Sequence, residues 1–335
     1  MRKLLIGASA SLFTLLTIAA IGLYWGYQSV VSFSQAPLNI DAEQELEIKR
    51  GSSFHQVSAT LVERGAINDL WKLKLLVKLR PELSHIRSGL YQIETTDTVS
   101  SLLDKLTQGR VMVFNATLIE GKTIKEWQAE LKQLPRINWQ DDVFNIVLKA
   151  NGDDSGLPEG KFFPDTYHYS AGDELSVIVE QSYQKMQQQL KVAWEGRDKD
   201  IPLASPYELL IMASIIEKET GKASERPWIS AVFTNRLRKG MRLQTDPTVI
   251  YGMGDRFDGN IRRKDLREMT PFNTYRINGL TPTPIAAPSG ASLLAAAHPA
   301  DVDYLYFVSK NDGSHIFSKS LAEHNRAVNQ YQRNR

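Results

Sequence analysis

Two glutamates, Glu217 and Glu219, close an apolar segment and are the residues best suited to chemistry. Ser205 is a good N-cap, Glu208 completes a capping box and Gly221 is a natural stop, so residues 205–221 predict one helix. The apolar residues between these signals should bury Glu217 and partly desolvate its carboxyl group. Such an acid keeps its proton closer to neutral pH and can act as a general acid. The alternative is that both glutamates are solvated at a helix end.

The residue composition and the absence of common motifs exclude several kinds of active site. The 335 residues contain 0 Cys, which excludes disulfides, thiolate metal sites and cysteine nucleophiles. The 6 histidines are scattered, and no HExxH, GxSxG or glycine-rich phosphate loop occurs. We therefore expect no metal or other cofactor. Carboxylates among amides, hydroxyls and aromatic rings are typical of carbohydrate sites, where an acid protonates a glycosidic oxygen.

Charge and hydrophobic content fit a globular protein. The formal net charge is +2, with 42% hydrophobic and 23% charged residues. This balance provides no strong basic field, so no nucleic-acid partner is expected.

Residues 4–31 carry no charged side chain and exceed the roughly 20 apolar residues that span a bilayer. Arg2 and Lys3 precede this run, and the next basic residue is Lys49. The positive-inside rule then places residues 1–3 in the cytoplasm and the bulk of the chain in the periplasm. A cleaved signal peptide is the alternative, but the small-x-small sequence at residues 8–10 lies too early, inside the apolar run. The prediction is a single-pass anchor in the cytoplasmic (inner) membrane.

The remaining chain predicts a linker, residues 32–42, and two domains, residues 43–110 and 111–335. The first domain should contain a strand, two helices and a strand, followed by a further helix, at residues 45–48, 52–64, 69–79, 86–94 and 99–108. This βααβ order is similar to a LysM module, a fold that binds N-acetylated glycans. The alternative is a spacer without a binding site.

The second domain should mix helices, strands and loops. Strand 111–120 and the hairpin 304–309 with 315–318 accompany helices at 123–134, 175–194, 205–221 and 224–240. Residues 157–169, 241–252, 271–275 and 279–290 are predicted to be loops. The fold class is therefore α+β: an N-terminal transmembrane helix, a small LysM-like βααβ domain and a larger mixed α+β catalytic domain.

Several ordered motifs in the second domain carry a family resemblance. These are PEGKFFPDTY, ASIIEKETG, NRLRKGMRLQTDPTVIYG, FNTY, GLTPTPIAAPSG, AAAHPA and FSKSLAEHN. Together they resemble the endolytic murein transglycosylase family, also called MltG or YceG-like. The resemblance covers nearly the whole chain, including the anchor and the LysM-like unit.

The resemblance implies a metal-free lyase with its active domain outside the cytoplasmic membrane. Such an enzyme cleaves the MurNAc-β-1,4-GlcNAc bond within nascent peptidoglycan strands and leaves a 1,6-anhydro-MurNAc end. The implied partners are peptidoglycan glycan strands, the cytoplasmic membrane and peptidoglycan synthases. The implied catalytic group is the first Glu of the EKE element, Glu217, which protonates the leaving oxygen and then takes a proton from the C6 hydroxyl of MurNAc.

Other candidate residues are assigned to substrate binding. Glu219 is a poor second catalytic carboxylate because residues two apart on a helix do not face each other. The LQTDPT element supplies three candidates for the cleft, Gln244, Thr245 and Asp246, and Asp246 is the rival second carboxylate. Asn273 and Tyr275 of the NTY element could bind an acetamido group and stack on a sugar ring.

Structural roles are the alternatives for these residues. Side-chain to backbone bonds could fix the LQTDPT loop, with Asp246 capping a turn. Tyr275 could be a buried ring whose hydroxyl has a partner. Two other function classes stay open as well: a non-catalytic peptidoglycan-binding scaffold and a muramidase that hydrolyses the same bond.

The membrane assignment predicts a specific topology. If residues 4–31 are an uncleaved anchor, the protein should stay in the membrane fraction after a high-salt wash, because a spanning helix is not held by surface charge. A reporter fused to the C-terminus should be active only outside the cytoplasm. Fractionation and N-terminal sequencing check both points. A soluble, N-terminally shortened form in the periplasm would contradict the prediction.

Overall fold

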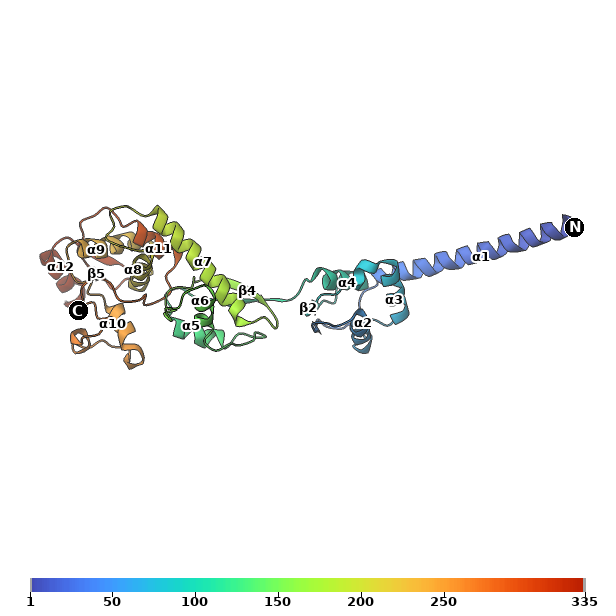
Figure 1. Ribbon diagram of the computed structural model, residues 1–335, viewed down its shortest axis with the longest axis horizontal. Helices are drawn as coiled ribbons and strands as arrows, with labels where there is room; N and C mark the ends of the chain where they lie inside the picture. Colours follow the sequence, from blue (N-terminus) through green and yellow to red (C-terminus); the bar gives the residue numbers. More distant parts are fainter. Residues whose placement is uncertain (1, 334–335) are drawn as a thin grey trace. The chain divides into compact units, whose positions relative to one another are not determined.

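The computed structural model describes the backbone of residues 2–333 and the side chains of residues 12–332. The fold is mixed α+β, and about half of the described residues are helical. The chain forms two compact units (Figure 1). Unit 1 contains the chain up to Phe114 together with Ser170–Gly172, and unit 2 contains Asn115–Tyr169 and the chain from Asp173 onward.

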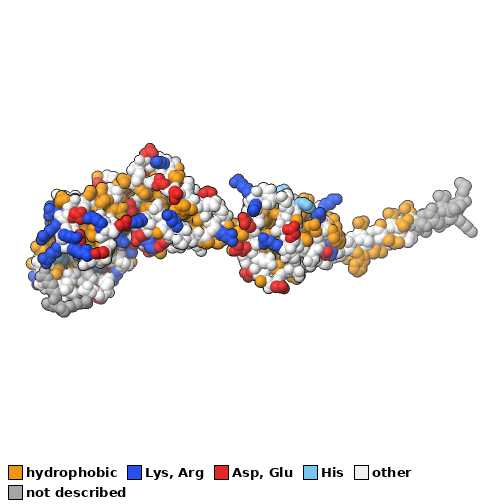
Figure 2. Space-filling model, turned by 90° about the horizontal axis from the view of Figure 1, so that it is seen from below, with side chains coloured by type: hydrophobic (Ala, Val, Ile, Leu, Met, Phe, Trp, Pro, Cys, Tyr) orange, Lys and Arg blue, Asp and Glu red, His pale blue; other side chains and the backbone are white. Residues whose placement is uncertain are grey.

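Unit 1 begins with the long helix α1 (Arg2–Gln35). Its segment Leu12–Gln35 is long and apolar enough to cross a membrane, and almost none of it is buried against the protein. Hydrophobic side chains cover the described part of this helix (Figure 2). These properties are consistent with a single-pass anchor or with a signal sequence.

The segment predicted as a linker, residues 32–42, is partly helical in the structure. Helix α1 continues to Gln35, and Val30 near its end is buried in the core of unit 1. Leu38 is also buried, and its N–H donates to the carbonyl of Asp97 at 2.9 Å. Apolar contacts therefore hold the first part of this segment against unit 1, where a polar composition predicts a free connection.

The rest of unit 1 follows the predicted strand and helix order. Its elements are β1 (Gln44–Ile48), α2 (Phe54–Glu63), α3 (Leu70–Leu79), β2 (Gly89–Ile93) and α4 (Val99–Gln108). Strands β1 and β2 are antiparallel, with Gln44 opposite Ile93 and Ile48 opposite Gly89. The helices pack a core with both strands, and Leu46, Tyr91 and Leu102 are among its buried side chains.

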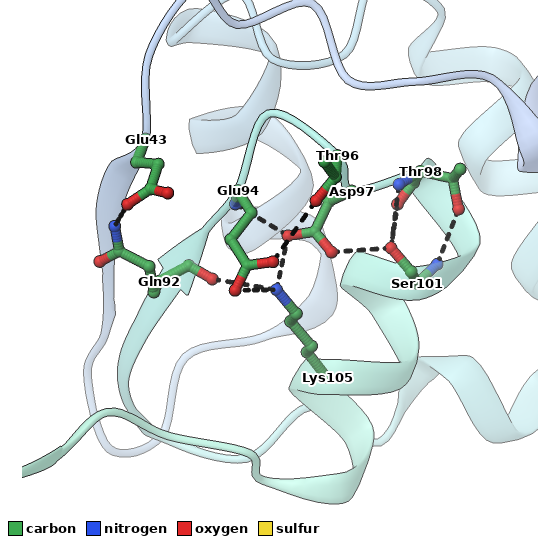
Figure 3. Close-up of polar contacts among 8 residues, drawn as sticks. All are labelled: Glu43, Gln92, Glu94, Thr96, Asp97, Thr98, Ser101 and Lys105. Carbon is green, nitrogen blue, oxygen red and sulfur yellow. Dashed lines mark hydrogen bonds and ion pairs between the residues drawn. The ribbon is translucent and has the colours of Figure 1, made fainter.

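A buried carboxylate connects β2 to α4 (Figure 3). Asp97 accepts hydrogen bonds from the N–H of Glu94 at 2.9 Å and the hydroxyl of Ser101 at 2.9 Å. The ammonium of Lys105 lies 2.7 Å from the same carboxylate. Burial alone would raise the pKa of Asp97, but Lys105 and these hydrogen bonds outweigh it and lower the pKa. The ion pair therefore fixes the start of α4 against the end of β2.

Unit 2 is larger and mainly helical. Its helices are α5 (Ile124–Leu131), α6 (Val143–Ala150), α7 (Leu175–Gly196), α8 (Pro206–Glu219), α9 (Arg226–Arg238), α10 (Asp246–Met253), α11 (Gly290–Ala297) and α12 (Leu321–Val328). Strands β3 (Val113–Thr117) and β4 (Thr166–Ser170) form one pair, and β5 (Tyr306–Ser309) and β6 (His315–Ser318) form an antiparallel hairpin. The predicted hairpin is thus confirmed.

Helix α8 is the centre of unit 2. It contacts α7, α9, α10 and α11, and every residue from Leu209 to Ile216 is buried. An apolar sequence on all sides of a helix requires such an environment. The predicted N-cap is present, since the hydroxyl of Ser205 accepts the N–H of Glu208 at 3.2 Å. The residues after Ile216 emerge from this core, where they can reach neighbouring loops.

Several elements differ from the predicted ones. Part of the loop 241–252 is the helix α10, because Pro247 lies in the first turn, where a missing N–H costs no helical hydrogen bond. Gly252 lies inside the same helix, and a Cβ there would come within 2.8 Å of the Cβ of Phe272. The end of the predicted loop 157–169 forms β4, and α6, α11 and α12 were not predicted.

A second buried carboxylate joins three segments of unit 2. Glu159 accepts the N–H of Ile124 at 3.1 Å, at the start of α5, and the hydroxyl of Tyr251 at 3.2 Å, from α10. Burial raises the pKa of Glu159 to about 7, although both hydrogen bonds oppose the shift. The folded protein therefore holds a proton on this group at pH values where the unfolded chain releases it.

This raised pKa predicts how stability depends on pH. Stabilisation by protonated Glu159 is complete below about pH 4.5 and is lost as pH rises to about 7, because only the folded state retains the proton in this window. Glu159→Gln imitates the protonated acid. It should match the wild type near pH 4.5 and be more stable at pH 8, by on the order of 3 kcal/mol.

Denaturant unfolding between pH 4.5 and 8 measures the difference. The raised pKa of Glu219 also makes stability fall as pH rises, so Glu159→Gln should remove only part of the pH dependence of stability. The control Glu195→Gln changes an exposed carboxylate on α7 and should leave the slope unchanged. Parallel curves for Glu159→Gln and wild type would refute the proposed protonation.

Candidate active site

A cavity of about 480 Å³ in unit 2 brings together most of the residues predicted from the sequence. Five of them line it: Glu219, Gln244, Thr245, Asp246 and Tyr275. They come from the end of α8, the start of α10 and the loop that contains the NTY element. Its lining also includes β5 and α12 residues that the sequence analysis did not select.

Glu219 is the carboxylic acid at the centre of this group. The hydroxyl of Thr245 donates to its Oε1, and Asp246 is close enough to influence its charge. Burial, assisted by the negative charge of Asp246, raises the pKa of Glu219 to about 7, although Thr245 and Arg236 oppose the shift. Near neutral pH the acid and the carboxylate are therefore both populated, which suits a group that first donates and then accepts a proton.

Buried threonines hold the segment that faces Glu219. The N–H of Thr245 donates to the hydroxyl of Thr274 at 3.0 Å, and the hydroxyls of Thr248 and Thr274 lie 2.8 Å apart. All three side chains are buried. This network fixes the direction of the Thr245 hydroxyl and thus the position of the Glu219 carboxyl group.

Tyr275 and Asp246 form the polar wall beside the acid. The phenol of Tyr275 donates to Oδ1 of Asp246 at 2.7 Å. Burial and the adjacent Asp246 raise the pKa of Tyr275 above its ordinary value, so the phenol remains neutral. Asp246 is the first residue of α10, where the helix dipole favours a negative charge.

Gln244 has an unusual backbone conformation. Its φ is 52°, in the left-handed region that side chains other than glycine rarely adopt. Its N–H donates to the carbonyl of Thr274 at 3.2 Å, and the residue is exposed at the cavity. The surrounding contacts maintain this strain, which directs the amide side chain into the cavity lining.

Glu217 lies on a different side of α8 and does not line this cavity. Its Oε2 accepts the N–H of Ser289 at 2.8 Å and the Ser289 hydroxyl at 2.5 Å. Its Oε1 lies 3.6 Å from a guanidinium nitrogen of Arg226. The expected burial is confirmed, since the side chain is 4% exposed. It is two positions from Glu219, which is about 200° around a helix with 3.6 residues per turn.

Asn273 is also outside the cavity. It is buried, and its amide donates to the carbonyls of Asp265 at 3.0 Å and Glu268 at 2.7 Å. Its Oδ1 accepts the N–H of Tyr275 at 3.0 Å. These hydrogen bonds occupy the amide N–H groups and oxygen of Asn273 that the predicted contact with an acetamido group of the substrate requires. The geometry supports a positioning role for Asn273, which sets the backbone of Tyr275.

Arg236, Tyr306 and His324 are among the cavity-lining residues that the sequence analysis did not select. Arg236 and His324 lie within the motifs NRLRKGMR and FSKSLAEHN, so the signal was present. The packing of β5 against α9 and of α12 against β5 brings these residues together. Within the described part of the chain, no group of three or more His, Asp or Glu side chains is arranged to hold a metal ion.

Comparisons with known proteins agree with these motifs. The sequence model of the YceG-like family matches residues 46–330. The chain is 32% identical to an endolytic murein transglycosylase of Bacillus subtilis (strain 168), over 85% of this chain and 84% of that protein. It is 24% identical to an endolytic murein transglycosylase of Streptococcus pneumoniae (strain R6), over 95% of this chain but only 64% of that protein.

A solved structure is similar as well. The crystal structure of a YceG-like protein from Listeria monocytogenes matches with a TM-score of 0.56 and 28% sequence identity. The match covers 86% of this chain and 99% of that chain.

The backbone strain at Gln244 predicts contrasting effects of two substitutions. Gln244→Val should lower the free energy of unfolding by roughly 1–2 kcal/mol, because a β-branched residue is poorly accommodated at positive φ. Gln244→Gly should change it by less than about 1 kcal/mol, since relief of strain offsets the greater freedom of the unfolded chain. Denaturant unfolding of both variants provides the measurement. Equal destabilisation by valine and glycine would show that the strain is absent in solution.

Proposed function

The chain belongs to the YceG-like family, and from this premise we propose that it is a lytic transglycosylase of peptidoglycan. The relatives named endolytic murein transglycosylase support this assignment, since murein is peptidoglycan. In the proposed reaction the enzyme cleaves MurNAc-β-1,4-GlcNAc bonds within nascent strands. The product carries a 1,6-anhydro-MurNAc end, and no water is added.

The proposed chemistry requires one group that works first as an acid and then as a base. An acid protonates the glycosidic oxygen as the bond to C1 of MurNAc breaks. The C6 hydroxyl then bonds to C1, and its proton passes to the carboxylate formed in the first step. Each cycle thus returns the carboxyl group to its protonated form.

Glu219 is the group that the geometry supports for both transfers. It lines the cavity, and its pKa of about 7 populates both protonation states near neutral pH. This combination is the observation that carries the proposal. The family resemblance assigns the role to Glu217, but Ser289 and Arg226 already occupy that carboxylate outside the cavity.

We propose a positioning role for Glu217. Ser289 is the N-cap of α11, so the bonds from Glu217 connect the end of α8 to the start of α11. This connection sets the direction in which α8 presents Glu219. Gln244, Thr245, Asp246 and Tyr275 are proposed to bind the sugar rings through their amide, hydroxyl, carboxylate and phenol groups.

Asp246 favours a second candidate reaction. A muramidase uses a second carboxylate across the bond, and Asp246 is a carboxylate beside Glu219 in the same cavity. The masses of the products separate the two reactions, because hydrolysis adds one water to each cut and transglycosylation adds none. The absence of any cut would instead support a non-catalytic scaffold.

Helix α1 and unit 1 are proposed to hold the catalytic unit close to the cell wall. We propose that α1 anchors the protein in the cytoplasmic membrane, with unit 2 in the periplasm. The βααβ core of unit 1 is proposed to be LysM-like, and it either binds glycan or spaces the catalytic unit from the membrane. Peptidoglycan synthases are proposed partners because nascent strands are the substrate.

Paired substitutions at the two glutamates test the assignment. Glu219→Gln keeps the volume of the side chain but cannot transfer a proton, so turnover of glycan strands should fall at least 10³-fold. Glu217→Gln can still accept from Ser289 and should lose much less, roughly 10-fold or below, through altered positioning. Mass analysis of purified, uncrosslinked strands provides rates and product ends together.

Thermal melting of both variants controls for folding. Glu219→Gln should melt at or above the wild-type temperature at pH 8, because it imitates the neutral acid. If Glu217→Gln abolishes turnover while Glu219→Gln retains it, the roles of the two glutamates are reversed.

A further inference from the structure

One end of the cavity contains a buried cation without a counter-ion. Arg236 on α9 is 8% exposed and lines the cavity. Among the described residues, no carboxylate lies within ion-pairing distance of Arg236. A buried charge is costly unless a partner compensates it, so this position requires an explanation.

Protein groups accept hydrogen bonds from two of the three guanidinium nitrogens of Arg236. Nε donates to the carbonyl of Leu305 at 2.7 Å, and Nη1 donates to the carbonyls of Leu243 at 2.6 Å and Arg242 at 3.2 Å. Nη1 also lies 3.5 Å from the amide oxygen of Gln244. Among the described residues, none accepts a hydrogen bond from Nη2. Neutral carbonyls thus fix the guanidinium plane and leave one pair of N–H donors for a ligand.

Aromatic rings lie beside the guanidinium, and Glu219 acts on its charge without being in ion-pairing distance. The ring of Tyr306 lies 5.2 Å from the guanidinium carbon, and the ring of His324 stacks on Tyr306 at 5.2 Å. Burial and the charge of Arg236 lower the pKa of His324, so its imidazole is neutral at pH 7. Its Nδ1 is buried without a partner. His315, which also lines the cavity, pairs with Glu225 at 2.7 Å.

We propose that Arg236 forms a subsite for a carboxylate of the substrate, with Nη2 as the donor and Tyr306 and His324 as the adjoining wall. The subsite shares its cavity with Glu219 and rests on the proposed function. Peptidoglycan offers this chemistry in two places: the stem peptide on MurNAc, and the lactyl group of MurNAc when the stem has been removed. Both present a carboxylate next to the sugar whose C1 reacts.

Physical chemistry favours an anion here over other ligands. A guanidinium is permanently charged, and its bonds to carboxylates are stronger than bonds between neutral groups. Glu219 cannot fill this role, because it is directed to Thr245 and is not ion-paired with Arg236. A bound carboxylate would compensate the buried charge and orient the strand relative to the catalytic acid.

The subsite is tested by measuring KM and kcat of wild type and variants on intact and chemically blocked strands. The substrates are uncrosslinked strands with intact stems and the same strands whose carboxylates have been converted to methylamides. With wild type, KM should rise about tenfold on blocked strands while kcat changes less than threefold. Arg236→Gln should show the raised KM already on intact strands, and blocking should then have no further effect.

The control Arg238→Gln removes an exposed cation from the same helix, where Arg238 pairs with Asp200 at 2.8 Å. Its KM should remain within twofold of wild type on intact strands. Because Arg236 also holds backbone carbonyls, Arg236→Gln could fold poorly, so the wild-type comparison of intact and blocked strands stands by itself. Equal KM for those two substrates and for strands without stems would overturn the subsite.

A third substrate separates the two sources of the carboxylate. Strands stripped of stems by an amidase keep only the lactyl carboxylate. Intact strands lack the lactyl carboxylate, because the stem converts it to an amide. A KM about tenfold lower than that of intact strands therefore identifies the lactyl position, whereas a tenfold higher KM identifies the stem peptide. Failure of the proposed function is distinct, because strands would then stay uncut or gain one water at each cut.

Discussion

The burial of α8 from Leu209 to Ile216 is the constraint on which the structure of unit 2 depends. Its apolar residues have no solvated face, so α7, α9, α10 and α11 must surround it. The polar residues that follow Ile216 emerge where these neighbours end. The position of every group in the cavity is therefore defined relative to one rigid helix end, which is how a site can hold reacting groups within a narrow geometry.

The two glutamates at the end of α8 contact different segments because of helix geometry. Residues two apart point to nearly opposite sides, so one reaches the cap of α11 and the other reaches the loop before α10. Ser289 and Arg226 satisfy the first carboxylate. Glu219 receives a single hydroxyl and lies near the negative charge of Asp246. The same sequence element thereby provides one structural connection and one proposed catalytic acid.

Unit 2 keeps several charged groups away from water at some cost in stability. Burial raises the pKa values of Glu159 and Glu219 to about 7, and Arg236 has only neutral acceptors. Glu159 is used to join α5 and α10, whereas the other two residues face the cavity. Buried charges retained beside a cavity are typical of functional sites, where ligands supply the missing interactions.

The sequence alone determined the apolar N-terminal helix, the βααβ order of unit 1, the α8 boundaries and the family, because each depends on local periodicity, caps or ordered motifs. It also selected Thr245, Asp246 and Tyr275, which do line one cavity. Only the tertiary structure decided which glutamate faces that cavity, that Asn273 serves the backbone, and that Arg236 lies beside Glu219. These facts depend on contacts between residues far apart in the chain, which set burial and charge, and no local pattern encodes them.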